Sequence, residues 1–210
     1  MISISSLRAR LVERTRRVDE RPGYAAVLVP LLDVDGQLSL LLTRRTEKLS
    51  THKGHVAFPG GRMDAGDDGP IGAALREANE EVGLPRAHVD VIGLLDDFPT
   101  VTDDMVVTPV IGWVEGAPEL VANEYEVARI FTIPVQALMN RDAWVVRYWD
   151  KNGIDYPVFY FDWDGETLWG LSAYITLQFL TLLPDGPPIE LPPPYGRGPI
   201  RGHPQAVSQD

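Results

Sequence analysis

The chain has 210 residues, of which 44% are hydrophobic and 23% charged, values typical of a globular protein with a sizeable core. It contains no cysteine, which excludes disulfides, iron–sulfur clusters, thiolate zinc sites and a cysteine nucleophile. The 30 acidic residues exceed the 19 Lys and Arg and give a net charge of −11, which argues against nucleic acids or anionic membranes as partners.

The N-terminal part of the sequence predicts a helix followed by strands. Residues Ser6 to Arg21 include six arginines and indicate a solvated surface helix, or alternatively a face that binds a partner. Two β-rich runs and the turn between them predict a hairpin: Tyr24–Leu32, Asp33-Val34-Asp35-Gly36 and Leu38–Thr43. A short strand, His55–Phe58, then leads into the tight turn Pro59-Gly60-Gly61.

A central helix is predicted from about Pro70 to Val82. Pro70 suits the first turn of a helix, where a missing N–H group costs nothing. Gly83 suits the C-terminal cap, and Pro85 prevents the helix from continuing. These three residues therefore fix both ends of the helix.

The elements expected downstream are two strands, a short helix, a second hairpin and a long apolar helix: Val89–Leu95, Val106–Val114, Phe131–Asn140, Ala143–Trp149 with Tyr156–Phe161, and Trp169–Leu183. Strands on both sides of one central helix favour an α/β (α+β) fold with a mixed sheet packed by helices. The last 27 residues contain eight prolines and predict an irregular tail. We therefore divide the chain into an N-terminal helical extension (1–22), one main domain (23–183) and a Pro-rich C-terminal tail (184–210).

The central helix carries a cluster of glutamates. At about 100° per residue, Glu77, Glu80 and Glu81 share one face, beside an apolar stripe that can pack on the sheet. Such carboxylates repel one another, and the dipole of the last helical turn disfavours them. Pairing of Arg76 with Glu80, or a bound divalent cation, would offset this repulsion. Oxygen ligands without cysteine indicate Mg²⁺ or Mn²⁺ rather than zinc, although on spacing alone the glutamates could also be a solvated face.

The charge just upstream of these glutamates is opposite. Residues 41–62 contain five bases and one acid, whereas residues 64–81 contain six acids and one base. Metal-assisted phosphoryl chemistry needs cations and backbone N–H groups to hold an anion, and carboxylates to hold the metal. The net charge of −11 therefore does not exclude a small phosphorylated substrate.

The residues from Arg76 to Leu84 read REANEEVGL and match the second half of the box G-x5-E-x7-REUxEExGU, where U is a bulky apolar residue. The chain therefore resembles the Nudix hydrolases. The first half of the box departs, because Asp67 stands in place of Glu and eight residues, not seven, separate it from Arg76. Ala78 is also small for its position.

A subfamily pattern accounts for these departures. Gly60 through Leu84 fits GGxxDxxDx6ALREAxEExGL, which resembles the coenzyme A pyrophosphatases. The upstream pattern LLTxR, Gly, FPGG of that subfamily is also present, from Leu41 to Gly61. Thr46 replaces the usual Ser or Ala, and Ser50 replaces the usual Arg or Gln, which puts one substrate contact in doubt.

The resemblance implies a Nudix-type α/β/α sandwich and a role for each matching residue. Glu77 and Glu81 are expected to be the principal Mg²⁺ or Mn²⁺ ligands, with Glu80 sharing a metal or held by Arg76. The general base is expected to be Glu80 or Glu126. Substrate contacts are expected from the basic segment and the glycine turn: Arg45, Lys48, His52, Gly60, Gly61 and Arg62.

The expected reaction is metal-dependent cleavage of coenzyme A or its derivatives into 4′-phosphopantetheine, or its acyl form, and adenosine 3′,5′-bisphosphate. The alternatives are a Nudix hydrolase of another nucleoside diphosphate derivative, such as ADP-ribose or NADH, and a non-catalytic module that senses a nucleotide.

We expect a cytoplasmic location, because the sequence has no apolar run of about 18 residues and no signal-peptide pattern. The tryptophans at 113, 149, 163 and 169 are expected mainly in the core, although one aromatic ring could stack on adenine.

Overall fold

The computed structural model describes residues 3–20, 23–49, 51–100, 105–151, 154–189 and 191. The main sheet contains eight strands: β1 (Tyr24–Val34), β2 (Gln37–Arg45), β3 (Val56–Ala57), β4 (Gly60–Arg62), β5 (Val89–Leu94), β6 (Phe98–Pro99), β7 (Val106–Val114) and β8 (Val127–Pro134). Its path runs β3-β2-β1-β7-β5, with β4 paired to β1, β6 to β7 and β8 to β2. Strands β1 and β7 are parallel and the other pairs are antiparallel, which confirms the predicted mixed sheet.

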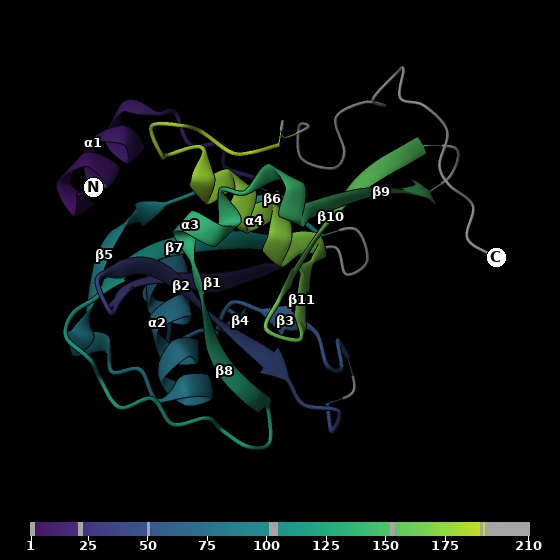
Figure 1. Ribbon diagram of the computed structural model, residues 1–210. Helices are drawn as coiled ribbons and strands as arrows, with labels where there is room; N and C mark the ends of the chain where they lie inside the picture. The colour runs from purple at the N-terminus through teal and green to yellow at the C-terminus, as the bar shows by residue number, and fades with distance from the viewer. Residues whose placement is uncertain are drawn as a thin grey trace.

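Helices cover both faces of this sheet, as Figure 1 shows. Helix α2 (Gly69–Val82) packs on one face through the predicted apolar stripe, and its Ala74, Ala78 and Val82 are fully buried. Its predicted end is confirmed: Gly83 has a φ of 67°, a left-handed conformation that favours glycine, and its N–H group donates to the carbonyl of Asn79. Helices α3 (Val135–Leu138) and α4 (Gly170–Leu180) pack on the opposite face.

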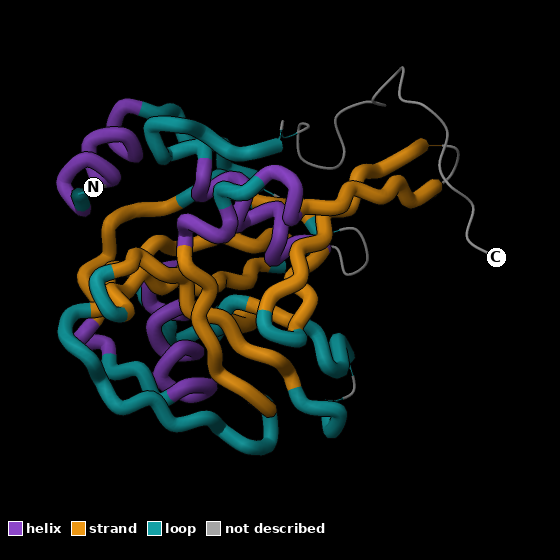
Figure 2. The backbone as a smooth tube through the Cα atoms, in the orientation of Figure 1, coloured by secondary structure: helices purple, strands orange, loops and turns teal. Residues whose placement is uncertain are grey.

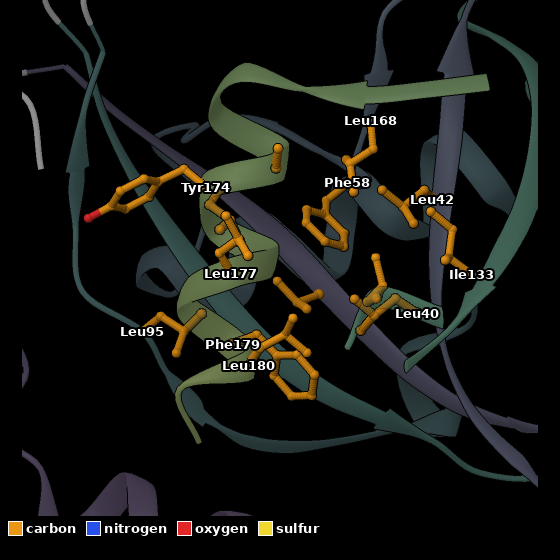
Figure 3. Close-up of a cluster of buried hydrophobic side chains, with 14 of the residues drawn as sticks. Leu40, Leu42, Phe58, Leu95, Ile133, Leu168, Tyr174, Leu177, Phe179 and Leu180 are labelled. Carbon is orange, nitrogen blue, oxygen red and sulfur yellow. The ribbon is translucent and has the colours of Figure 1, made fainter. Parts of the chain in front are cut away.

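The larger core lies between α4 and the sheet, and Figure 3 shows part of it. Side chains from α4 meet side chains from β2 and β8, all of them buried: Tyr174, Leu177, Phe179, Leu180, Leu40, Leu42 and Ile133. Burying one such aliphatic side chain contributes about 1.5–3 kcal/mol to folding. This core holds β2 in place, and β2 ends at the predicted basic segment.

A second sheet of three antiparallel strands follows in the sequence: β9 (Trp144–Lys151), β10 (Ile154–Trp163) and β11 (Glu166–Trp169). The pairing of β9 with β10 confirms the second predicted hairpin, although its predicted turn, Asn152-Gly153, lies outside the described residues. Figure 2 shows the far ends of β9 and β10 projecting from the body of the protein as a two-stranded arm.

The N-terminal extension differs from its prediction. Helix α1 covers only Ile4–Glu13, and the chain then runs without regular structure to residue 20, so the predicted helix Ser6–Arg21 is wrong in extent. Its arginines are not simply solvated, because Arg14 and Arg17 pair with Asp96, and Arg16 pairs with Asp97.

Asp97 anchors this extension to the sheet. Its carboxylate is buried and accepts hydrogen bonds from the Arg16 guanidinium, from the Asp19 backbone N–H at 3.0 Å and from the Thr108 hydroxyl at 2.6 Å. Thr108 belongs to β7, so one carboxylate joins the N-terminal extension to the middle of the sheet. Burial of a charge is stabilised only when partners of this kind are present.

The prediction of a short helix at Phe131–Asn140 is wrong over its first four residues. Phe131 to Pro134 complete β8, which pairs with β2, and only Val135–Leu138 is helical. The last predicted helix is confirmed over Gly170–Leu180. Short 3₁₀ turns lie at Arg86–His88 and Arg141–Ala143.

Most of the predicted Pro-rich tail, residue 190 and residues 192–210, lies outside the described residues. Within the described part of the chain, every helix is too short or too polar to cross a membrane.

Candidate active site

Glu81 is the most enclosed carboxylate of α2. Its exposed fraction is 3%, and its Oε2 atom accepts a hydrogen bond of 3.2 Å from the backbone N–H of Gly60. Its other oxygen, Oε1, lies 3.6 Å from Nη1 of Arg45. The glycine turn and the end of β2 therefore both meet the face of α2 that carries the glutamates.

The environment of these carboxylates disfavours negative charge. Burial raises the pKa of Glu81 to about 7, and the charges of Glu77 and Glu126 add to this effect, although Arg45 and the Gly60 N–H oppose it. Burial also raises the pKa of Glu77, with smaller contributions from Glu80 and Glu126, against the opposing hydrogen bond from Arg76. Glu77, Glu81 and Glu126 therefore form one electrostatically coupled cluster.

Arg76 holds the outer edge of this cluster. Its guanidinium donates to Asp67 at 2.9 and 3.0 Å, to Glu77 at 2.9 Å, to Glu80 at 3.0 Å and to the Arg62 carbonyl at 3.0 Å. Glu80 is more than half exposed, whereas the Asp67 side chain is almost fully enclosed. The hydrogen bonds from Arg76 hold the pKa of Asp67 below its usual range.

The sequence predicts no role for Asp67, which stands where the box has Glu. The structure gives this residue a positioning role, because it orients the arginine that in turn contacts Glu77 and Glu80. The signal available in the sequence was the pairing of an acid and a base across one loop, Asp67 and Arg76.

A loop over residues 121–126, the covering loop, brings Glu126 to the cluster. The backbone N–H of Asn123 donates to the carbonyl of Glu81 at 2.9 Å, which ties this loop to the end of α2. Thr46 holds its other side, because the Thr46 hydroxyl donates to the Tyr125 carbonyl at 2.6 Å and the Thr46 N–H to the Glu126 carbonyl at 2.9 Å. The Thr46 hydroxyl group therefore helps to hold the covering loop against the end of β2.

Gly60 and Gly61 allow close approach between β4 and its neighbours. A Cβ atom at Gly60 would lie 2.3 Å from the backbone oxygen of Ala26, so a side chain there would displace a strand. A Cβ atom at Gly61 would lie 2.4 Å from Oε1 of Glu77. The lack of a side chain at Gly61 therefore leaves room for a candidate metal-ligating carboxylate.

We expect Gly61→Ala to lower kcat about 100-fold with little change in the free energy of unfolding. The added methyl group would meet only the end of the Glu77 side chain, which can move, but a displacement of about 1 Å in a reacting site has an effect of this size. Steady-state kinetics and urea unfolding measure the two quantities. The matched control is Gly66→Ala, where the space around the glycine is open. Wild-type kcat in Gly61→Ala would contradict the importance of the Glu77 position.

The other predicted substrate contacts lie around this cluster at different depths. Arg45 is partly buried, and its Nε atom has no hydrogen-bond partner among the described residues. Lys48, His52 and Arg62 are exposed, and the Lys48 ammonium donates to a backbone oxygen of the covering loop at 3.4 Å. Ser50, the departure from the subfamily pattern, lies outside the described residues.

The cluster has the donor chemistry for a hard divalent cation. Its side chains offer only carboxylate oxygens, and burial raises the pKa of both Glu77 and Glu81, an effect that a bound cation would oppose. In the part of the chain that the structure describes, no three His, Asp or Glu side chains already converge on one metal-binding point.

Comparisons with known proteins found one matching family and several similar proteins. The family described as NUDIX domain matches residues 22–151. The uncharacterized Nudix hydrolase NudL of Photorhabdus laumondii is 34% identical over 182 residues, which cover 85% of this chain and 96% of that protein. Its counterpart in Yersinia enterocolitica is 37% identical over 155 residues, covering 72% of this chain and 77% of that protein. Among solved structures, a MutT/nudix family protein from Enterococcus faecalis matches with a TM-score of 0.48 and 17% identity, covering 81% of this chain and 63% of that one.

Proposed function

Because the chain belongs to the Nudix family and is a pyrophosphohydrolase of that family, we propose that it cleaves coenzyme A or its derivatives with the help of Mg²⁺ or Mn²⁺. The products would be 4′-phosphopantetheine, or its acyl form, and adenosine 3′,5′-bisphosphate. The choice of coenzyme A rests on the sequence patterns from Leu41 to Gly61 and from Gly60 to Leu84.

One observation carries the catalytic part of the proposal. Glu81 is a buried carboxylate whose pKa is raised to about 7. It lies beside Glu77, and its Oε1 atom is 3.6 Å from Nη1 of Arg45, whose Nε atom has no hydrogen-bond partner in the part of the chain that the structure describes. Burial of such a carboxylate destabilises the fold, and groups with pKa values shifted in this way cluster at functional sites. A divalent cation on the carboxylates and a phosphate on Arg45 would satisfy both groups.

The two principal metal ligands would be Glu77 and Glu81, with Glu80 as the outer candidate because Arg76 already holds its carboxylate at the surface. When bound, the cation supplies positive charge that offsets the charge developing on the phosphate oxygens. The Arg45 guanidinium would hold a phosphate oxygen from the opposite side. The Asp67–Arg76 pair would keep α2 and the Gly60-Gly61 turn in register, because Arg76 also contacts the carbonyl of Arg62.

The general base would be Glu126 rather than Glu80. Glu126 lies close enough for its charge to raise the pKa of both Glu77 and Glu81, whereas Glu80 points to solvent and pairs with Arg76. A water molecule would attack one phosphorus atom, its proton would pass to the Glu126 carboxylate, and the bond from that phosphorus to the bridging oxygen would break. The other phosphate group would leave with the bridging oxygen.

A turnover comparison tests the substrate. With Mg²⁺ or Mn²⁺ in the buffer, we expect kcat/KM for coenzyme A to exceed that for ADP-ribose and NADH by at least about tenfold, the effect of about 1.4 kcal/mol in transition-state binding. The assay follows phosphate-containing products by chromatography for all substrates side by side. A reversed order would overturn the coenzyme A assignment but leave the hydrolase intact. No hydrolysis of any of them would favour a nucleotide-sensing module.

A further inference from the structure

The three-stranded sheet β9–β11 carries an aromatic face that the catalytic chemistry does not use. Tyr160 of β10 lies opposite Trp169 of β11 in the strand register, and their parallel rings have centroids 5.9 Å apart. Trp149 of β9 lies 5.8 Å from Trp169, and His55 meets Trp169 edge-on at 4.8 Å. We call these four residues, Trp149, Tyr160, Trp169 and His55, the aromatic platform.

The platform is open to solvent on one side. The exposed fraction of Trp149 is 51%, which contradicts the expectation that it would be a core residue. A tryptophan this exposed gives up much of the stabilisation that burial would bring, so fold stability alone does not account for it. Trp149 belongs to β9, and Figure 2 shows that the far end of the β9–β10 hairpin stands out from the body of the protein.

The platform is continuous with the candidate active site. The carbonyl of His55 accepts a hydrogen bond of 2.9 Å from the backbone N–H of Arg45, whose guanidinium faces Glu81. The two strands that carry these residues also touch, because Nε of Arg44 in β2 lies 3.5 Å from a carboxylate oxygen of Glu166 in β11. A molecule held at Glu81 and Arg45 therefore has the platform as its neighbour along the sheet edge.

Charges of both signs lie near the platform: the Glu47 carboxylate acts on the His55 imidazole, and cations lie close to Tyr160 and before His55 in the chain. The Arg147 guanidinium lies 5.1 Å from the centre of the Tyr160 ring, and Lys53 is an exposed base in the loop before His55. Flat aromatic rings with adjacent cations suit a heterocyclic base that carries phosphates, since every nucleobase has a π-face that stacks on tryptophan. A purely apolar ligand would gain no binding energy from the cations.

We propose that the aromatic platform, with Trp149 as its exposed ring, binds the nucleobase of the substrate while the diphosphate lies at Glu81 and Arg45. This inference rests on the proposed function for the identity of the substrate class, a nucleoside diphosphate derivative. Recognition of the base would then be the role of β9–β11, which the metal and phosphate chemistry does not use.

Equilibrium dialysis with adenosine 3′,5′-bisphosphate tests the platform without any need for turnover. We expect Trp149→Ala to raise Kd about tenfold and Trp149→Phe to restore most of the affinity, because base–aromatic stacking has an effect of this order. The control is Val12→Ala, which removes an exposed side chain from helix α1 and should leave Kd unchanged. Pantetheine 4′-phosphate, which lacks a base, should bind wild type and Trp149→Ala equally.

Kinetics separate this inference from the proposed function. If coenzyme A is the substrate, Trp149→Ala should raise its KM about tenfold and change kcat by less than about twofold, since stacking contributes equally to the ground and transition states. An unchanged Kd in Trp149→Ala, or no saturable binding of the nucleotide to wild type, would overturn the platform. Failure of coenzyme A hydrolysis together with Trp149-dependent nucleotide binding would overturn the substrate and leave the platform in place.

Discussion

Glu81→Gln is expected to lower kcat at least about 1,000-fold while the protein stays folded. The amide has the shape of the carboxylate and can still accept the hydrogen bond from the Gly60 N–H, so the turn between β3 and β4 is kept. It loses the negative charge that would hold the cation, and metal-derived stabilisation of a transition state amounts to several kcal/mol. Steady-state kinetics in excess Mg²⁺ or Mn²⁺ measure this loss.

The same substitution should stabilise the metal-free protein. Burial raises the pKa of Glu81 from 4.5 to about 7, so the folded state binds its proton more tightly than the unfolded state does. The free energy of unfolding then falls as the pH rises between these two values, and the whole destabilisation is present above about pH 7. Glutamine has no charge to bury, and we expect Glu81→Gln to gain on the order of 3 kcal/mol at pH 8.

Thermal unfolding with and without Mg²⁺ distinguishes a metal ligand from a structural carboxylate. Mg²⁺ should raise the Tm of wild type and raise that of Glu81→Gln much less, because only a site present in the folded state is stabilised by its ligand. Glu124→Gln is the control, since this glutamate lies exposed in the covering loop. Unchanged kcat in Glu81→Gln, or an equal effect in Glu124→Gln, would contradict the metal assignment.

Asp97→Asn is expected to lower the free energy of unfolding by about 3 kcal/mol. The carboxylate is buried, and it faces three donors, from Arg16, Asp19 and Thr108. An asparagine amide would set its own N–H donors against one of these groups and leave the Arg16 charge without its partner. Removing one member of a buried charged pair typically costs about 3–5 kcal/mol, and the partial exposure of Arg16 reduces this.

Urea unfolding of Asp97→Asn and Asp90→Asn, side by side, provides the measurement and its control. Asp90 pairs with Arg8 of α1, but both side chains are about 40% exposed, so its loss should change stability by less than about 1 kcal/mol. Equal effects of the two substitutions would mean that the N-terminal extension is attached no more firmly at Asp97 than at the surface pair.

Elements with local signals were predictable from the sequence. Helix α2 ends where Gly83 and Pro85 indicate, and its buried stripe is the one given by the helical period. The sequence predicts a helix at Phe131–Pro134, where the structure has a strand, because the strand depends on pairing with β2, which lies about 90 residues earlier in the chain. The predicted helix at the N-terminus extends too far for a related reason. Arg14, Arg16 and Arg17 form ion pairs with aspartates in the loop after β5, and these distant partners determine the path of the chain after α1.

The sequence predicts which residues form the candidate site, but not how deeply each of them is buried. The helical period places Glu77, Glu80 and Glu81 on neighbouring positions, but it does not tell which of them is covered. Glu81 is buried because β4 and the covering loop lie over it, and these segments are separated from it in the sequence. Trp149 is likewise half exposed in the β9–β10 hairpin, whose projection from the body of the protein no local pattern indicates.

The most direct test of the account is product analysis by mass spectrometry after incubation of the purified protein with coenzyme A. In buffer containing Mg²⁺ or Mn²⁺, we expect 4′-phosphopantetheine and adenosine 3′,5′-bisphosphate in equal amounts, no products after addition of a chelator, and at most traces from Glu81→Gln. Intact coenzyme A in the presence of metal, or equal product formation by wild type and Glu81→Gln, would contradict it.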